Sequence, residues 1–170
     1  LQDDGKILVS GFSWPDGNSV SGPNDFALAR YNTDGNLDTS FGTGGKVTIP
    51  IGTIGNVTGP NGSSVVALDG GKILVVGPAL NDGNIDFGVV RLNTDGSPDE
   101  TFGVDGILLV GGPGDDVPYD IAVRPDGSIV VAGDIRTGAG IEIGLVIIGT
   151  DANDELIGGR ILALPLYRME

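Results

Sequence analysis

The chain has 170 residues, a formal net charge of −14 at pH 7, and neither cysteine nor histidine. Nucleic acids and anionic membrane surfaces are bound through Lys and Arg, so this charge argues against both as partners. The missing residue types exclude disulfides and the catalytic sets that depend on a thiol or an imidazole. No apolar run approaches the length of a membrane span, so we expect no membrane insertion.

Glycine and proline are frequent, with 31 and 10 residues, and they separate many short runs of Val, Ile and Leu. This composition is typical of β-strands joined by tight turns. No long segment carries apolar residues at helical spacing, so we predict an all-β chain. The sequence starts at Leu1 without a signal-like segment, and we expect any targeting sequence to lie upstream.

Self-comparison reveals a repeat of about 56 residues. GKILVSG (5–11) recurs as GKILVVG (71–77) and as GSIVVAG (127–133). DFALARYNTDGNLDTSFGTGGKV (25–47) recurs as DFGVVRLNTDGSPDETFGVDGIL (86–108). The first copy carries two short insertions in turn-rich stretches, where a loop tolerates extra length.

Each repeat is predicted to contain four short antiparallel strands. The first strand is nearly all apolar, which is typical of burial on both faces; it covers residues 7–9, 73–76 and 129–132. The second strand alternates, with Phe26 and Leu28 on one face.

The third strand also alternates, with Val47, Ile49 and Ile51 on one face, and its Pro50 suits a sheet edge. The fourth strand covers residues 65–69 and 120–126. It ends in Asp-Gly, which predicts a hairpin into the first strand of the next repeat.

Four antiparallel strands per repeat predict the blades of a partial β-propeller. We divide the single repeat domain into residues 1–69, truncated at the N-terminus, 70–126, and a degenerate third repeat at 127–170. A β-solenoid is the alternative fold, although its coils are usually much shorter than these repeats. About three blades are fewer than the four of the smallest usual propellers, so we expect missing blades in a longer protein or self-association.

The segments DGKILVSG, DFALARYNTDGNLDTSFGTGGKV and DFGVVRLNTDGSPDETFG resemble the delta-60 repeat of bacterial secreted and cell-surface proteins. The resemblance is strong for residues 1–133 and weak beyond them. It implies a propeller-like fold within a large exported protein, at an extracellular or cell-surface location. It implies no catalytic residues, because the family has none to carry over.

The turn after the second strand carries oxygen-bearing side chains at alternate positions. This spacing opens EF-hand-type calcium loops, where it directs hard oxygen ligands at one centre. The candidate ligands are Asp34, Asn36 and Asp38 in the first repeat, and Asp95, Ser97 and Asp99 in the second. The alternative is a tight turn in which Asp caps its own backbone, Gly takes a positive φ, and Phe41 or Phe102 is buried behind it.

A third acidic stretch, GTDANDELIGG at residues 149–159, resembles the glycine- and aspartate-rich calcium-binding nonapeptide of RTX proteins. Its candidate calcium ligands are Asp151, Asn153 and Asp154. The stretch also aligns with the turn of a degenerate third blade, although Ala152 stands where both motifs prefer glycine. The interpretations as blade turn, calcium site and chance similarity stay open, and Ca²⁺ is the only cofactor indicated.

Two loops contain residue types that could serve catalysis or binding. Asp115 and Asp116 lie between Gly and Pro, so we expect an exposed, solvated turn in preference to a catalytic acid–base pair. Trp14 is the only tryptophan. It suits either an exposed anchor for a partner or a side chain folded against its own blade.

The function that these observations favour is a non-enzymatic structural or binding module of an exported or cell-surface bacterial protein, which presents loops to a protein or carbohydrate partner. The alternatives are a fragment of a calcium-binding secreted protein of the RTX type, and a propeller enzyme with a site at the axis. An axial site would be lined by the ends of the first strands. These ends, at Ser10, Gly11, Gly77 and Gly133, offer no convergent catalytic groups.

Overall fold

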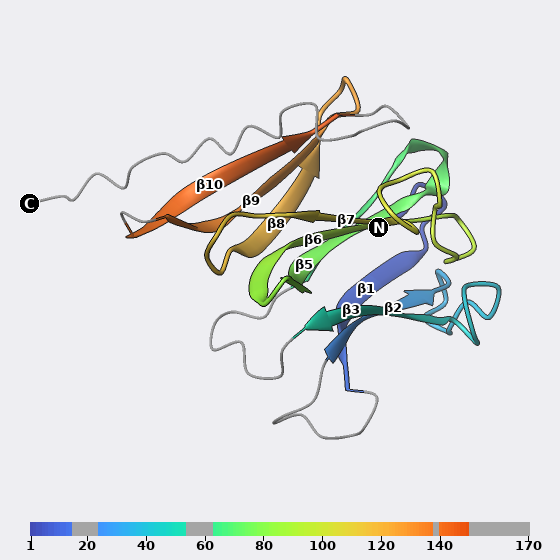
Figure 1. Cartoon of the computed structure of the whole chain (residues 1–170). Helices are drawn as coiled ribbons and strands as arrows, with labels where there is room; N and C mark the ends of the chain where they lie inside the picture. Colours follow the sequence, from blue (N-terminus) through green and yellow to red (C-terminus); the bar gives the residue numbers. More distant parts are fainter. Residues whose placement is uncertain (15–23, 54–62, 138–139, 150–170) are drawn as a thin grey trace, which may run out of the picture.

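The computed structural model describes residues 1–14, 24–53, 63–137 and 140–149. Within these ranges the chain forms ten strands and one 3-10 turn, η1 (Asp69–Gly71). Figure 1 shows the strands in three antiparallel sheets, with the second sheet between the other two. No helix in these ranges has the length and hydropathy of a membrane span.

We call the three sheets blade 1, blade 2 and blade 3. Blade 1 has the order β1-β2-β3, formed by β1 (Ile7–Ser13), β2 (Asn24–Tyr31) and β3 (Lys46–Thr53). Blade 2 has the order β4-β5-β6-β7, formed by β4 (Ser64–Ala67), β5 (Ile73–Asn81), β6 (Asn84–Leu92) and β7 (Ile107–Val110). Blade 3 has the order β10-β9-β8, formed by β8 (Val117–Val123), β9 (Ile129–Thr137) and β10 (Gly140–Ile148).

The hairpins predicted between successive repeats are confirmed. β4 pairs with β5 across η1, and β8 pairs with β9 in the same antiparallel way. Blades 2 and 3 therefore each begin with the last strand of the preceding sequence repeat. β4 and β8 also lie against one another, and Ser64 Oγ donates a 2.8 Å hydrogen bond to Asp120 Oδ1 between them.

The glycines of the first strands lie in mid-strand, and the expectation that they end these strands is wrong. Gly11, Gly77 and Gly133 pair with residues of β2, β6 and β10, and each strand continues beyond its glycine. β5 ends only at the hairpin turn formed by Asp82 and Gly83, whose φ angles are 48° and 92°. Such positive angles are what a two-residue hairpin turn requires.

Two apolar cores hold the blades together, one on each face of blade 2. The core between blades 1 and 2 includes Phe26, Leu28, Phe41, Ile73, Val75, Val90 and Leu92. The core between blades 2 and 3 includes Leu74, Val76, Phe87, Val89, Ile121, Ile129, Val131 and Val146. Because β5 contributes alternate residues to both cores, its apolar run is buried on both faces, as predicted.

The same expectation is wrong for β1. Ile7 and Val9 on its outer face are 39% and 48% exposed. In β9, Val130 and Ala132 on the outer face are only half-buried, whereas Ile129 and Val131 are buried. These strands belong to the first and last blades, and among the described residues no further blade covers their outer faces.

The alternation predicted for the third strand is confirmed in β3. Ile49 and Ile51 are buried, while Pro50 is exposed. In the described structure β3 pairs only with β2, so the missing N–H of Pro50 lies at a sheet edge. Three antiparallel sheets packed face to face are the blades of a partial β-propeller, as the repeats predict, and the described residues form no solenoid coils.

Candidate functional site

The first two members of each predicted calcium-ligand set bond to each other within an exposed turn. Asp34 Oδ1 accepts from the Asn36 backbone N–H at 2.9 Å, and its Oδ2 accepts from the Asn36 amide at 3.0 Å. Asp95 Oδ1 accepts from the backbone N–H and the hydroxyl of Ser97 at 2.9 and 2.7 Å. These hydrogen bonds lower the pKa of both carboxyls. The glycine that follows each Asp has a φ above 80°, which is the geometry of a tight Asp-Gly turn.

The third member of the first set, Asp38, is buried and held by an arginine. Its Oδ2 lies 2.8 Å from Arg30 Nε and 3.1 Å from Lys6 Nζ, and its Oδ1 accepts from the Ser40 hydroxyl at 2.6 Å. The hydrogen bonds from Ser40, and then from Lys6, hold the pKa of Asp38 well below its usual range. The Arg30 guanidinium lies over the Phe41 ring, 4.5 Å from the ring centroid. Asp38 thus ties the loop after β2 to its own strand.

Asp99 occupies the same position in the second repeat. Its Oδ2 lies 2.7 Å from Arg91 Nε and accepts a hydrogen bond from Lys72, while its Oδ1 accepts from the Thr101 hydroxyl at 2.7 Å. Burial raises the pKa of Asp99, but the hydrogen bonds from Lys72, Thr101 and Arg91 outweigh it and hold the pKa well below the usual range. Arg91 lies over Phe102, 4.6 Å from the ring centroid. The Arg-to-Asp spacing of eight residues recurs in both repeats, so the sequence contained a pattern that predicts these pairs.

The acidic turn of the second repeat also contacts blade 1. The Arg30 Nη1 group donates to the carbonyl of Thr94, and the Gly42 backbone N–H donates to the carbonyl of Asp95 at 2.7 Å. The turn therefore helps to join neighbouring blades, a role that its residue types alone do not indicate.

The structure separates the members of the first two predicted ligand sets, because in each of them two residues lie in the exposed turn and the third lies in a buried ion pair. Among the described residues, no group of three or more acidic side chains could hold a metal ion. Asp151, Asn153 and Asp154 lie outside the described residues, as does almost all of the stretch 149–159.

We expect the described acidic turns to contribute no Ca²⁺-dependent rise in the melting temperature, because their carboxylates already have intramolecular partners. Calorimetry in Ca²⁺ and in EDTA measures this. If Ca²⁺ raises the melting temperature, variants Asp154→Ala and Asp95→Asn separate the sources. A rise that survives Asp154→Ala but is lost in Asp95→Asn would contradict the prediction.

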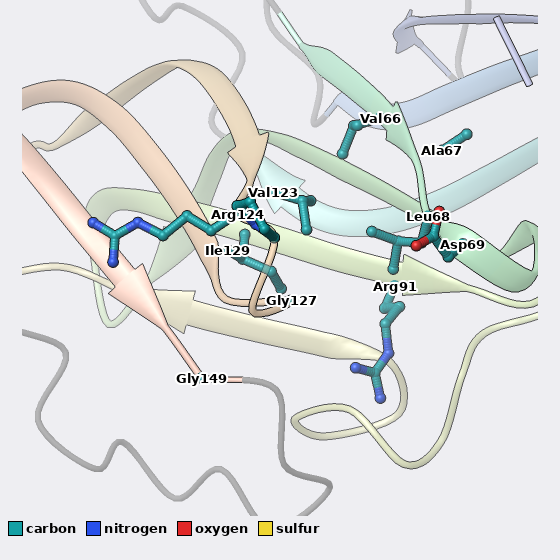
Figure 2. Close-up of a pocket in the computed structure, with 11 residues that line it drawn as sticks. Val66, Ala67, Leu68, Asp69, Arg91, Val123, Arg124, Gly127, Ile129 and Gly149 are labelled. Carbon is teal, nitrogen blue, oxygen red and sulfur yellow. The ribbon is translucent and has the colours of Figure 1, made fainter.

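A cavity of about 580 Å³ lies between blades 2 and 3, where β4 and β8 end (Figure 2). Apolar side chains line part of it, namely those of Val66, Leu68, Val123 and Ile129. Asp69, Arg91 and Arg124 contribute polar groups. Figure 2 shows the two guanidinium groups pointing away from one another. Arg91 is held by Asp99, whereas Arg124 is exposed. We call this cavity the interblade pocket.

A second cavity, of about 610 Å³, lies between blade 1 and the acidic turn of blade 2. Its lining is more polar and includes Ser40, Lys46, Asp95 and Ser97. The sequence did not predict either cavity, because both lie where residues far apart in the chain meet.

The loop between β7 and β8 differs from the expected solvated turn. Asp116 is 1% exposed; its carboxylate accepts from the backbone N–H groups of Gly112 and Arg136 at 2.8 and 2.7 Å. Asp115 is exposed, as expected, and accepts from the Ile85 backbone N–H at 3.1 Å. The expectation for Asp116 was wrong because the backbone donors come from β9 and from the loop itself, which only the fold brings together.

Asp86, at the start of β6, is a buried acid that the sequence did not single out. It is 2% exposed, and its Oδ2 accepts from the Asn81 amide at 2.7 Å, while its Oδ1 has no hydrogen-bond partner among the described residues. Burial raises the pKa of Asp86, and the charges of Asp116 and Asp115 add to this effect. A raised pKa suits a general acid, but Asp86 lines neither of the two cavities.

Trp14 follows the end of β1 and is 38% exposed. Its side chain is therefore neither fully buried against blade 1 nor fully presented to solvent. Residues 15–23, which follow it, lie outside the described part of the chain.

A scan against protein-family models matches residues 2–41 and 71–102 to a domain of unknown function (DUF5122) described as a beta-propeller. Both matched segments contain a first strand, a second strand and the acidic turn with its Arg–Asp pair, and together they make up less than half of the chain. A search of the curated proteins finds no match. Over its two well-preserved repeats, the chain is thus similar to a β-propeller family of unknown function.

Proposed function

We propose that the chain is a non-enzymatic structural and binding module of an exported or cell-surface bacterial protein. The observation that supports this most directly is that the acidic side chains of the repeated motif form structural ion pairs. Asp38 and Asp99, the acids of the repeated motif, are engaged by Arg30 and Arg91 in holding loops to strands. The motif that recurs along the chain therefore serves blade architecture. The export and bacterial origin rest on the delta-60 resemblance alone.

The interblade pocket is the surface that we assign to a partner. The chain has only nine Lys and Arg residues and a net charge of −14, yet the exposed Arg124 lines this pocket beside an apolar wall. Arg91 also lines it, but Asp99 already holds its guanidinium. A ligand with an acidic group next to an apolar group would match both features. This combination occurs in peptide segments, so a protein partner fits the pocket better than a neutral carbohydrate does.

Charge reversal at the rim tests this assignment. We expect Arg124→Glu to weaken binding of an acidic, apolar peptide about tenfold or more, because a favourable charge contact becomes a repulsive one (a tenfold change is about 1.4 kcal/mol). Peptide arrays and glycan arrays probed with the full chain supply the ligands. Lys46→Glu, which reverses an exposed charge at the other cavity, is the matched control and leaves binding unchanged.

Two results would overturn the proposal. If Arg124→Glu and Lys46→Glu weaken peptide binding equally, the interblade pocket is not the binding site. Turnover of a glycoside or ester substrate that is lost in Asp86→Asn would instead identify an enzyme, since Asp86 is a buried acid with a raised pKa and a carboxylate oxygen that has no partner among the described residues.

A further inference from the structure

A repeated contact joins each blade to the next, in which a bulky side chain on one blade packs on a glycine of the following blade. Phe26 of blade 1 packs on Gly77 of blade 2, where an added Cβ would lie 2.6 Å from the ring. Phe87 of blade 2 packs on Gly133 of blade 3, where the added Cβ would lie 2.8 Å from the ring. We call the bulky residue the knob and the glycine the seat. At Gly77 an added Cβ would meet the ring first, whereas at Gly133 it would lie still closer, at 2.2 Å, to the backbone oxygen of Val117 in blade 3 itself, so neither seat has room for a side chain.

One knob and one seat of this series have no partner among the described residues. In blade 2 the seat Gly77 pairs with Gly88, the residue directly after the knob Phe87. In blade 3 the seat Gly133 pairs with Gly144, so the residue directly before it, Ile143, occupies the position of a knob. Ile143 is 52% exposed. On blade 1 the corresponding seat is Gly11, and nothing lies within 4 Å of a Cβ built there.

Apolar side chains surround both positions. Beside the seat, Ile7 and Val9 are 39% and 48% exposed, although the equivalent residues of blade 2, Ile73 and Val75, are fully buried by blade 1. Beside the knob, Ile141 is 51% exposed. The outer face of blade 1 thus carries the seat half, and the outer face of blade 3 the knob half, of the same kind of interface that joins successive blades within the chain.

We propose that a second copy of this chain binds these faces head to tail, with Ile143 of one copy on Gly11 of the other. The occupant is a second copy because this chain carries both halves of the interface, in the order in which its own blades pack. In such a pair, the six described blades of the two copies would pack in series, and six lies within the usual range of four to eight blades. Head-to-tail contacts of this kind form closed rings when the rotation between copies permits it.

The molar mass in solution is the first test, measured by size-exclusion chromatography with light scattering. We expect a dimer, and we expect Ile143→Asp and Gly11→Leu each to raise its dissociation constant at least tenfold. Both changes spare the monomer, since Ile143 is half exposed and Gly11 has open space above it; an unchanged circular dichroism spectrum checks this. Val104→Asp, at a 76% exposed turn residue, is the control and leaves the dimer intact.

Cysteine pairing then tests the orientation, because the chain has no cysteine of its own. Under mild oxidation, we expect a mixture of the variants Gly11→Cys and Ile143→Cys to form disulfide-linked dimers, and neither variant to do so alone. Cross-linking of either variant with itself would overturn the head-to-tail pairing. A monomer at all concentrations would overturn the proposal as a whole, and would mean that another segment or another protein covers these faces.

Discussion

Gly77→Ala should lower the free energy of unfolding by about 1–3 kcal/mol, the usual cost of overpacking a core. The new methyl group would lie 2.6 Å from the Phe26 ring, in the core between blades 1 and 2. Neither the ring nor β5 can move away freely, because β5 is paired with a strand on each side. Gly11→Ala is the matched substitution in the same register of blade 1. It should be neutral or slightly stabilising, since its methyl group meets nothing within 4 Å and a strand prefers Ala to Gly.

Urea denaturation of both variants measures this difference. It should be carried out in an Ile143→Asp background, so that self-association does not contribute to the apparent stability. Equal effects of the two substitutions would show that glycine is needed for backbone reasons in every blade, and would contradict the knob-and-seat packing. Phe26→Leu combined with Gly77→Ala should recover part of the loss, because the smaller side chain leaves room for the methyl group.

Asp99→Ala should cost about 3 kcal/mol of the free energy of unfolding at pH 7. The side chains of Asp99 and Arg91 are 4% and 13% exposed, so the change leaves a largely buried guanidinium without its partner. Removing one member of a buried pair typically costs about 3–5 kcal/mol. We expect the lower end of that range, since Lys72, the other cation on Asp99, is 40% exposed and can turn to water. Glu100→Ala removes the neighbouring exposed acid and should change stability by no more than about 0.5 kcal/mol.

The pH dependence of this effect separates charge from packing. Folding lowers the pKa of Asp99, so its stabilising contribution is fully present above the unfolded-state pKa, which is about 3.9. That contribution is lost as the pH falls from there towards the folded-state pKa. The difference between wild type and Asp99→Ala should therefore be constant from neutral pH down to about pH 5 and shrink below pH 4. A difference that stays constant at acid pH would assign the role of Asp99 to packing instead.

Much of the fold follows from local patterns that the sequence shows directly. The repeats, the alternation of β3 and the hairpins at Asp69–Gly70 and Asp126–Gly127 depend on residues that are near one another in the chain. Their physical basis is local as well, since glycine accepts a positive φ and a strand exposes alternate residues to opposite faces. For the same reason, the sequence predicts the tight turns at Asp34 and Asp95 as one of two alternatives.

The candidate site was harder to predict, because its properties depend on long-range partners. Nothing in the sequence distinguishes Asp116 and Asp86 from other acids of loops and strands, and only the fold buries them. The alternate spacing of oxygen-bearing residues groups Asp38 and Asp99 with the turn residues, although the arginine eight residues before each of them is the better guide to its partner. The interblade pocket exists only because β4 and β8 come together from different repeats.

The sequence by itself therefore determined the all-β class, the four-stranded pattern and the tight turns, because these arise from backbone preferences and hydrophobic periodicity within a few residues. Only the tertiary structure decided which acids are buried, which glycines are seats, and which apolar strand faces remain uncovered. Burial and partner choice depend on how one blade packs on the next. Nearly identical first-strand motifs thus have different surroundings: in GKILVVG of blade 2, Ile73 to Gly77 are buried on both faces, while GKILVSG of blade 1 leaves Ile7 and Val9 exposed.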